Sequence, residues 1–103
     1  MTYPVYPASQ AIADVLAERD RQQDVEGFSA DHDDSHTDGS LAVAGVCYAT
    51  FAVSRQVNIW NLWPRSWDPS WWKPKDPRRD LVRAAALLIA EIERRDRAEV
   101  QHG

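Results

Sequence analysis

The sequence is poor in cysteine and has no long apolar run. Its one cysteine, Cys47, has no partner for an internal disulfide, so the sequence predicts a reducing cytoplasm as its location. No stretch approaches the roughly 18 uninterrupted apolar residues of a membrane span. The N-terminal residues MTYPVYPASQ lack a basic residue followed by an apolar run, so we expect neither a secretory signal nor a membrane partner.

The sequence also lacks a broad excess of basic residues. Its formal net charge is -4; residues 1–58 carry nine acids against three bases, whereas residues 59–103 carry seven acids against nine bases. The positive excess lies between Arg65 and Arg83, with six bases against three acids. A protein that binds duplex nucleic acid normally has a stronger and broader basic field. We therefore expect a small anion as partner, and no duplex.

The length of 103 residues fits a single domain, residues 1–103, with flexible tails at residues 1–7 and 100–103. Apolar periodicity predicts an all-α fold, a three-helix domain with an acidic loop and a connector rich in tryptophan and proline. The monomer has room for only one modest core, so we expect it to form a homo-oligomer.

The first two helices are expected at residues 8–24 and 40–56. Ser9 can cap the first and Gly27 can stop it, and one face of this helix holds Ile12, Val15, Leu16 and Arg19. Asp38 or Thr37 can cap the second helix, whose expected inner side holds Leu41, Ala44, Tyr48 and Phe51 or Ala52. Its valine, threonine and tyrosine content leaves a strand as the alternative.

The third helix is expected from Pro77 to about Glu99. Asp76 can cap it, and Pro77 fits the first helical position, where a missing N–H costs nothing. Its length of about 34 Å, at 1.5 Å per residue, exceeds what one partner helix of this chain can cover. A dimer or ring could share its apolar stripe, which consists of Leu81, Ala85, Leu88 and Ile92, widened by Val82, Ala86 and Ile89.

All five tryptophans lie in the connector. Pro64, Pro69 and Pro74 interrupt them, so we expect turns and short helical pieces. Trp60 and Trp63 stand beside aliphatic residues, which predicts a lid over the core. The other three stand beside cations, which predicts an open surface for a flat ring that carries phosphate. The residues expected to bind this ligand are Trp67, Trp71, Trp72, Lys73, Lys75, Arg78 and Arg79.

The acidic loop, residues 27–39, contains two histidines among aspartates. His32 and His36 are expected to contact a sugar or base edge of the ligand, and if the protein is an enzyme, His32, Asp34, His36 and Asp38 would be its acid/base groups or ligands. Their spacing matches no established metal signature, so we expect no metal and no cofactor. The alternative is a solvated acidic turn.

Several segments together resemble a family of small proteins encoded by tailed phages and prophages. The resemblance covers about residues 16–97 and rests on EGFSADHDDSHTDGSLAVAGVCYA, WPRSW, WWKP and RRDLVRAAALLIAEIERRDR. It implies a phage accessory protein in a bacterial cytoplasm and no particular chemistry.

Two helices also resemble the all-α pyrophosphohydrolases of the MazG kind. The similar segments are AERDRQ, at residues 17–22, and LVRAAALLIAEIE. Those enzymes hold magnesium with acidic pairs on successive helices, whereas this sequence has SLAVAGVCYA on its second helix. The resemblance implies a fold that can bind nucleotides without that catalytic mechanism.

The sequence therefore predicts a phage accessory protein that binds and sequesters a nucleotide-derived molecule, such as a host antiviral signal. One alternative is a phosphodiesterase or nucleotide hydrolase that uses the histidine loop. The other is an inhibitor that inserts its tryptophans into a host protein, because exposed indoles are common interface anchors.

Overall fold

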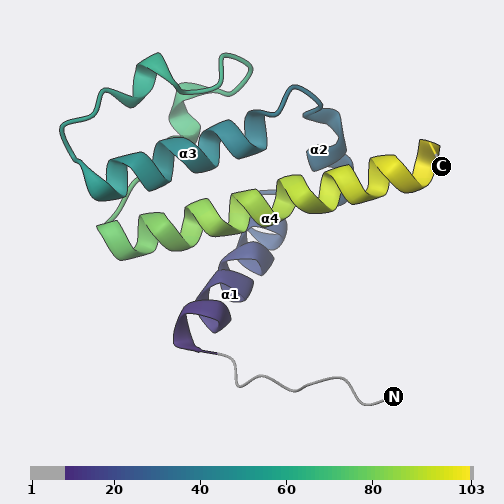
Figure 1. Ribbon diagram of the computed structural model, residues 1–103, viewed down its shortest axis with the longest axis horizontal. Helices are drawn as coiled ribbons and strands as arrows, with labels where there is room; N and C mark the ends of the chain where they lie inside the picture. The colour runs from purple at the N-terminus through teal and green to yellow at the C-terminus, as the bar shows by residue number, and fades with distance from the viewer. Residues whose placement is uncertain (1–8, 103) are drawn as a thin grey trace.

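The computed structural model describes residues 9–102, and this part of the chain is all-α and contains no strand (Figure 1). This confirms the predicted fold class. Three long helices dominate, and a fourth short helix and two 3₁₀ turns connect them. The elements are α1 (Gln10–Asp24), α2 (Ala30–Ser35), α3 (Ser40–Val53), η1 (Ile59–Asn61), η2 (Pro69–Trp71) and α4 (Pro77–His102).

The core lies mainly between α3 and α4, which run side by side, while α1 crosses on the other side of α4 (Figure 1). Gly45 brings α3 close to α4, because a Cβ there would lie only 3.2 Å from the carbonyl oxygen of Ala84. Small residues therefore set this helix spacing. The apolar core consists of Phe28, Leu41, Ala44, Cys47, Tyr48, Ile59, Trp63, Trp67, Ala84, Leu87 and Ala90.

The expected side-chain N-caps are present at α1 and α4. The Ser9 hydroxyl accepts the Ile12 N–H at 3.2 Å, and the Asp76 carboxylate accepts the Arg79 N–H at 2.9 Å ahead of Pro77. At α3 the N-cap position is Gly39, with φ of +79°; Asp38, one of the two predicted caps, lies one residue earlier, and its carboxylate accepts the Ser40 N–H at 3.0 Å.

Two segments differ from the sequence-based assignment. Residues 27–39 were expected to be a loop, but they contain α2, which begins where the Ser29 hydroxyl accepts the His32 N–H at 3.2 Å. The cap at Ser29 thus starts a helix in this segment despite its polar composition. The second difference is that helix α3 ends at Val53 rather than at residue 56.

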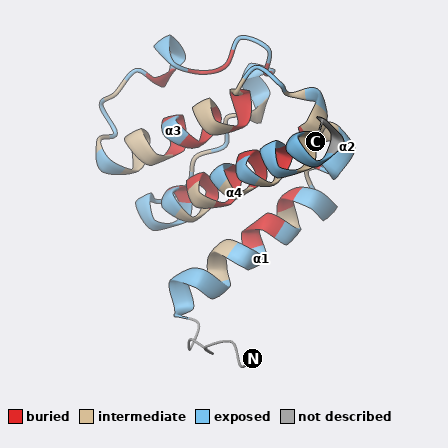
Figure 2. Ribbon diagram, turned by 45° about the vertical axis from the view of Figure 1, so that its right-hand side comes forward, coloured by how far each residue is buried: buried red, intermediate tan, exposed pale blue. Residues whose placement is uncertain are grey.

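The predicted face of α1 is buried only in part. Of its four residues Arg19 is buried and Val15 is half-buried, but Ile12 and Leu16 are more than half exposed. The buried residues of α1 are Glu18, Arg19 and Gln22. Figure 2 shows the reason: the buried residues of α1 gather in its C-terminal half, and its N-terminal half projects into solvent.

Ion pairs fill the region where α1, α2 and α4 meet. The guanidinium of Arg19, which is buried, lies 2.8 Å from the fully buried carboxylate of Asp33 and 3.0 Å from that of Glu93. This contact fixes α2, and with it His32, relative to the long helices. No helix within residues 9–102 combines the length and apolarity that crossing a bilayer requires.

Candidate functional site

The connector between α3 and α4 folds into a cluster of indoles. Asn58 caps η1 and Asp68 caps η2 through side-chain oxygens that accept backbone N–H groups, which confirms the expected turns and short helical pieces. Neighbouring rings meet edge to face. The centroid distances are 5.7 Å for Trp63–Trp67, 5.2 Å for Trp67–Trp71 and 5.4 Å for Trp63–Trp72.

The set of indoles that are buried differs from the set that the sequence predicted to be buried. Trp63 is buried as expected, but Trp60 is 52% exposed, so the expected lid does not include it. The expectation that Trp67 stays open was also wrong: it is 4% exposed, because Phe28, Trp63 and Trp71 surround its ring. Trp71 is half-buried.

The hydroxyl of Tyr48, on α3, holds the end of the connector. It accepts the Lys73 N–H at 2.9 Å and a proton of Arg83 at 3.3 Å, and it donates to the Trp71 carbonyl at 3.2 Å. Arg83 also donates to the Lys73 carbonyl at 2.6 Å. These bonds set the position of Trp71 relative to α3 and α4.

A narrow cleft lies between α1 and the residues that the Tyr48 hydroxyl joins. We call it the aromatic cleft. It encloses about 310 Å³ up to its open mouth, of which about 20 Å³ admits the centre of a water molecule. That is room for about one water in this conformation. The cleft is lined by Arg21, Gln22, Glu26, Phe28, Tyr48, Trp67, Trp71, Arg83 and Leu87.

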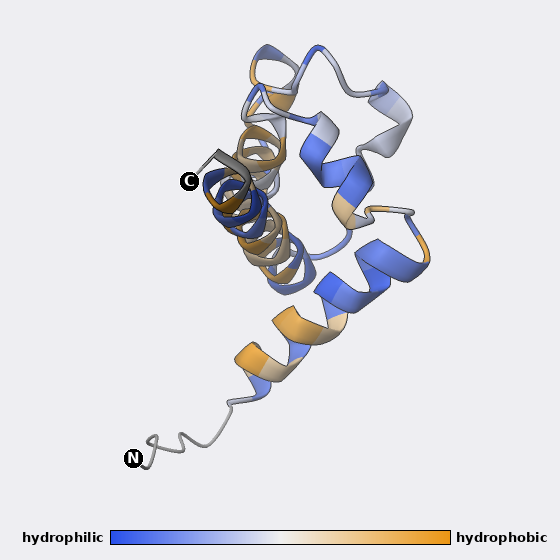
Figure 3. Ribbon diagram, turned by 90° about the vertical axis from the view of Figure 1, so that its right-hand side faces the viewer, coloured by the Kyte–Doolittle hydropathy of each residue, from blue (hydrophilic) through white to orange (hydrophobic). Residues whose placement is uncertain are grey.

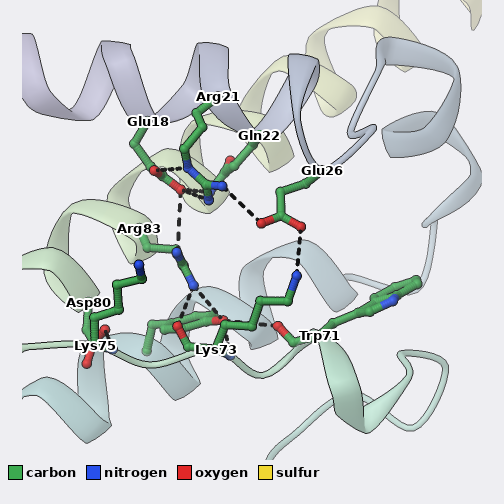
Figure 4. A network of polar contacts seen from close by, with 10 residues as sticks. Glu18, Arg21, Gln22, Glu26, Trp71, Lys73, Lys75, Asp80 and Arg83 are labelled. Carbon is green, nitrogen blue, oxygen red and sulfur yellow. Dashed lines mark hydrogen bonds and ion pairs between the residues drawn. The ribbon is translucent and has the colours of Figure 1, made fainter.

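Charged side chains alternate along the cleft (Figure 4). Arg21 donates to Glu18 at 2.7 and 2.8 Å and to Glu26 at 3.0 Å, and these contacts raise the pKa of Arg21 above its ordinary value. Lys73 reaches Glu26 at 3.3 Å, and Arg83 lies 3.5 Å from Glu18. Of these five side chains, Arg21, Glu26 and Arg83 line the cleft, so two bases against one acid leave a small positive excess there.

The two carboxylates of the cleft are ionised at neutral pH. Burial works to raise the pKa of Glu18 and of Glu26, but hydrogen bonds and charge from Arg21 outweigh it, and Lys73 adds to the effect at Glu26. Both pKa values therefore lie below the ordinary value. An anionic ligand would have to displace or share these arginine contacts.

Two residues that line the cleft hold buried polar atoms without a protein partner. They are the side-chain carbonyl oxygen of Gln22, which is 1% exposed, and the indole N–H of Trp67. A buried polar group without a partner costs about 1–3 kcal/mol. Two of the residues that line the cleft thus have an unpaired buried polar atom, one an acceptor and the other a donor.

A second cleft begins on the other side of Arg21. Arg78 and Arg79, predicted to bind phosphate, line this space together with Arg21; it encloses about 550 Å³ up to its open mouth and is larger than the aromatic cleft. Arg78 pairs there with Asp14 at 2.8 Å. The two clefts share Arg21, and we call the second one the arginine cleft.

Three other predicted residues of the connector line neither cleft. Trp72 is half-buried and packs against the core, on Tyr48 at a centroid distance of 4.5 Å and on Phe51. Lys73 and Lys75 are exposed: Lys73 pairs with Glu26 at 3.3 Å, and the backbone N–H of Lys75 bonds to the buried carboxylate of Asp80 at 2.8 Å. These three residues therefore lie outside both clefts.

The histidine loop and the tryptophans meet in space. His32 stacks on Phe28, with centroids 4.6 Å apart, and the His36 ring lies 5.6 Å from that of Trp67. His32 Nδ1 lies 3.2 Å from the buried Asp33 carboxylate, and its Nε2 lies 3.3 Å from Nε2 of His36. The histidines therefore support the aromatic cleft from behind rather than line it.

The predicted acidic residues of the loop have structural partners. Asp34 pairs with Arg97 at 2.8 Å, and Asp38 accepts bonds from the Ser40 N–H and the Ser66 hydroxyl. In the part of the chain that the structure describes, no group of three or more histidine, cysteine, aspartate or glutamate side chains is arranged to hold a metal ion.

The environment of His36 predicts a pH dependence of stability. Burial, reinforced by the nearby His32, lowers the pKa of His36 from its ordinary value of 6.5. The unfolded chain therefore binds this proton more readily, and the free energy of unfolding falls as the pH drops below 6.5. Carboxylates with lowered pKa values, such as Glu18 and Glu26, lose their contribution only below their ordinary value of 4.5.

Urea unfolding measured at several pH values between 7.5 and 5 tests this dependence. We expect the midpoint to fall across this range in wild type and to change less in His36→Gln. An equal slope in the two proteins would contradict the assignment.

Sequence reasoning missed most of the residues that line the aromatic cleft. Tyr48 and Arg83 lie 35 residues apart, and nothing in their local context indicates that they meet. For Arg21 and Gln22 a pointer existed, because both belong to the AERDRQ segment on which the expected likeness to the MazG kind rests; that likeness stays a prediction.

Comparisons with protein-family models, curated proteins and solved structures give no match for this chain.

Proposed function

We propose that the protein binds and sequesters an anionic ring compound of the nucleotide class in the aromatic cleft. The observation that carries the proposal is the pair of partnerless buried atoms on Gln22 and Trp67 beside the arginines. Nucleobases carry donors and acceptors on one edge, so a base can satisfy both atoms at once.

The surrounding side chains suit the rest of such a ligand. The ring of Trp71 is half-buried and offers a face for stacking, which contributes about 1–3 kcal/mol per base. Arg21 stands between the two clefts, so a phosphate attached to the ring would meet Arg21 first and Arg79 beyond it. Arginine is well suited to bidentate contacts with phosphate.

Entry of a base requires the aromatic cleft to widen. Trp71 is the element that can move, because it ends a three-residue 3₁₀ turn between Pro69 and Pro74. The Tyr48 hydroxyl holds the backbone at this point, but it leaves the indole itself unbonded to α1. The phage resemblance supplies the setting: a phage-encoded protein that removes a nucleotide-derived signal of its host.

Incubation of the purified protein with bacterial nucleotide extracts, followed by heat release and mass spectrometry, tests the proposal. We expect wild type to release an ultraviolet-absorbing phosphorylated compound in an amount comparable to the protein. Release of nothing above the level of a bovine albumin control would overturn it.

Gln22→Leu separates binding from folding. This change removes the partnerless acceptor and the long 3.3 Å bond from the amide N–H to Glu18, which keeps its bonds from Arg21, and it preserves the side-chain volume. We therefore expect little change in thermal stability but at least tenfold weaker binding of the released compound, in line with a buried hydrogen-bonding group left without its partner. Gln23→Leu, at an exposed neighbouring position, is the matched control and should bind as wild type. Equal affinities for Gln22→Leu and wild type would contradict the role of Gln22.

A second candidate function is hydrolysis of the bound nucleotide. It is favoured by the chain of contacts from Asp33 through His32 to His36, which resembles the orientation of a general base by a carboxylate. This candidate requires product formation that His36→Ala abolishes. An intact ligand recovered after long incubation with wild type would leave sequestration alone.

A further inference from the structure

The outward face of α4 carries an apolar stripe that residues 9–102 cover only in part. Leu81, Leu88 and Ile92 are 48%, 42% and 57% exposed, and the half-buried Ala85 completes the row. The core uses mainly the other side of the helix, through Ala84, Leu87 and Ala90. Within the stripe, Leu88 also lies beside Gly45 of α3, 3.5 Å from where a Cβ on Gly45 would stand, whereas Leu81 and Ile92 remain about half exposed.

The spacing of the stripe is that of a coiled-coil seam. Leu81, Ala85, Leu88 and Ile92 follow one another at intervals of 4, 3 and 4 residues, which is the alternation of a and d positions in a heptad. Continuing the same heptad outward places Arg78 at one end of the seam, and Arg95 and then Glu99 at the other. All three are exposed.

The apolar surface continues from the seam onto α1. Ile89 forms a groove of about 230 Å³ with residues of the projecting half of α1, which are Ala11, Ile12, Val15 and Leu16. Figure 3 shows this half of α1 as an apolar segment that extends away beneath α4. Isolated exposed apolar residues are common, but a continuous patch over two helices marks an interaction site.

We propose that a second copy of this chain covers the seam, with the two α4 helices antiparallel. The charges at the ends of the seam decide the orientation. A parallel pair would place Arg78, Arg95 and Glu99 each against its own counterpart, whereas an antiparallel pair can place Arg78 of one copy beside Glu99 of the other and keeps the two Arg95 side chains apart. The helix macrodipoles also oppose a parallel pair and favour an antiparallel one.

The antiparallel register also matches side-chain sizes at the centre of the seam. When Arg78 meets Glu99, the two-fold axis falls next to Leu88, and the small Ala85 of each copy faces the large Ile92 of the other. Toward the ends, Leu81 faces Asp96. From Arg78 to Glu99 the seam is about 32 Å long at 1.5 Å per residue. A contact of this length that includes the α1 groove is compatible with the roughly 800 Å² per partner of a standard interface.

The inference is independent of the proposed ligand, because the seam lines neither the aromatic cleft nor the arginine cleft except through Arg78. Sedimentation equilibrium tests it on the full chain without any ligand. We expect wild type to have twice the 11.7 kDa mass of one chain at micromolar concentration. Wild type that stays monomeric at about 200 µM would overturn the proposal.

Leu88→Glu is the decisive variant. It places two like charges next to the two-fold axis, so we expect the dimer dissociation constant to rise at least 100-fold while the helical circular dichroism is retained. Val53→Glu is the matched control, because Val53 is 85% exposed at the end of α3 and away from the seam. A dimeric Leu88→Glu protein, or equal weakening by both changes, would overturn the proposed interface.

Cysteine cross-linking tests the orientation. We expect a disulfide dimer under mild oxidation when Ala85→Cys and Ile92→Cys chains are mixed, and much less when either is oxidised alone. Wild type is the control, because its Cys47 is fully buried. Efficient cross-linking of Ala85→Cys with itself would overturn the antiparallel arrangement.

Discussion

Asp33→Ala is expected to lower the free energy of unfolding by about 3–5 kcal/mol, the cost of removing one partner from a buried ion pair. The Asp33 carboxylate is fully buried, 2.8 Å from the guanidinium of Arg19. Glu93 remains as a partner for Arg19, but it is attached to α4 and cannot anchor α2. Urea unfolding followed by circular dichroism measures the change.

Asp31→Ala is the matched control for this prediction. Asp31 is exposed on the same short helix, so its removal should change the free energy of unfolding by no more than about 0.5 kcal/mol. Similar losses for the two variants would show that the charge of α2, rather than the buried pair, matters for stability. A near-neutral Asp33→Ala would contradict the account of how α2 is held.

The buried pair matters beyond stability because it positions the wall behind the aromatic cleft. Asp33 lies on α2 next to His32, whose ring stacks on Phe28, and Phe28 lines the cleft. Loosening of α2 would therefore also loosen this wall. A stable binding surface in so small a domain depends on ion pairs as well as on the apolar core.

Trp71→Ala is expected to weaken binding of the captured nucleotide by roughly 5- to 150-fold, which corresponds to the 1–3 kcal/mol of one stacked base. Trp71 is the half-buried indole of the cleft and the one that must move to admit a ring. Isothermal titration calorimetry with the heat-released compound gives the two dissociation constants.

Trp60→Ala is the control for Trp71→Ala, since it removes an indole from the same connector. Trp60 is 52% exposed, touches only the edge of the indole cluster and lies outside the cleft. We expect its affinity to equal that of wild type. A larger loss for Trp60→Ala than for Trp71→Ala would favour the exposed surface as the binding site and contradict the aromatic cleft.

The helix ends were predictable from the sequence because they depend on near neighbours. The bonds of Ser9 and Asp76 to backbone groups three residues ahead are set by residue type and position. The short helix α2 follows the same rule through Ser29, but the polar composition of the loop concealed it. The residue types near the helix ends were therefore sufficient to predict where most of the long helices begin.

The inner face of α1 was not predictable from apolar periodicity. That reasoning assumes that apolar side chains are buried, whereas α1 buries Glu18, Arg19 and Gln22 and exposes Ile12 and Leu16. A charged side chain can be buried when a partner of opposite charge meets it, and Asp33 and Glu93 come from distant parts of the chain. Sequence spacing contains no information about such partners.

The candidate site was predicted only in part, because sequence spacing does not show which distant residues meet. The sequence pointed to the right segment, because Trp67, Trp71 and Arg79 do line the two clefts. It could not show that Trp67 would be buried or that Trp72 would join the core, because both outcomes depend on how the connector folds back onto α3. On α4 the expected stripe exists, but close packing at Gly45 directs the small Ala84 side of the helix to the core.

Nuclear magnetic resonance of the indole N–H groups tests the central claim, that a nucleotide-class ring enters the aromatic cleft. The five tryptophans supply five separate probes, and Trp67 presents its N–H without a protein partner. On titration with the captured compound we expect the resonances of Trp67 and Trp71 to shift to saturation while that of Trp60 stays fixed. Shifts confined to Trp60, or no shift in any indole at saturating ligand, would contradict the account.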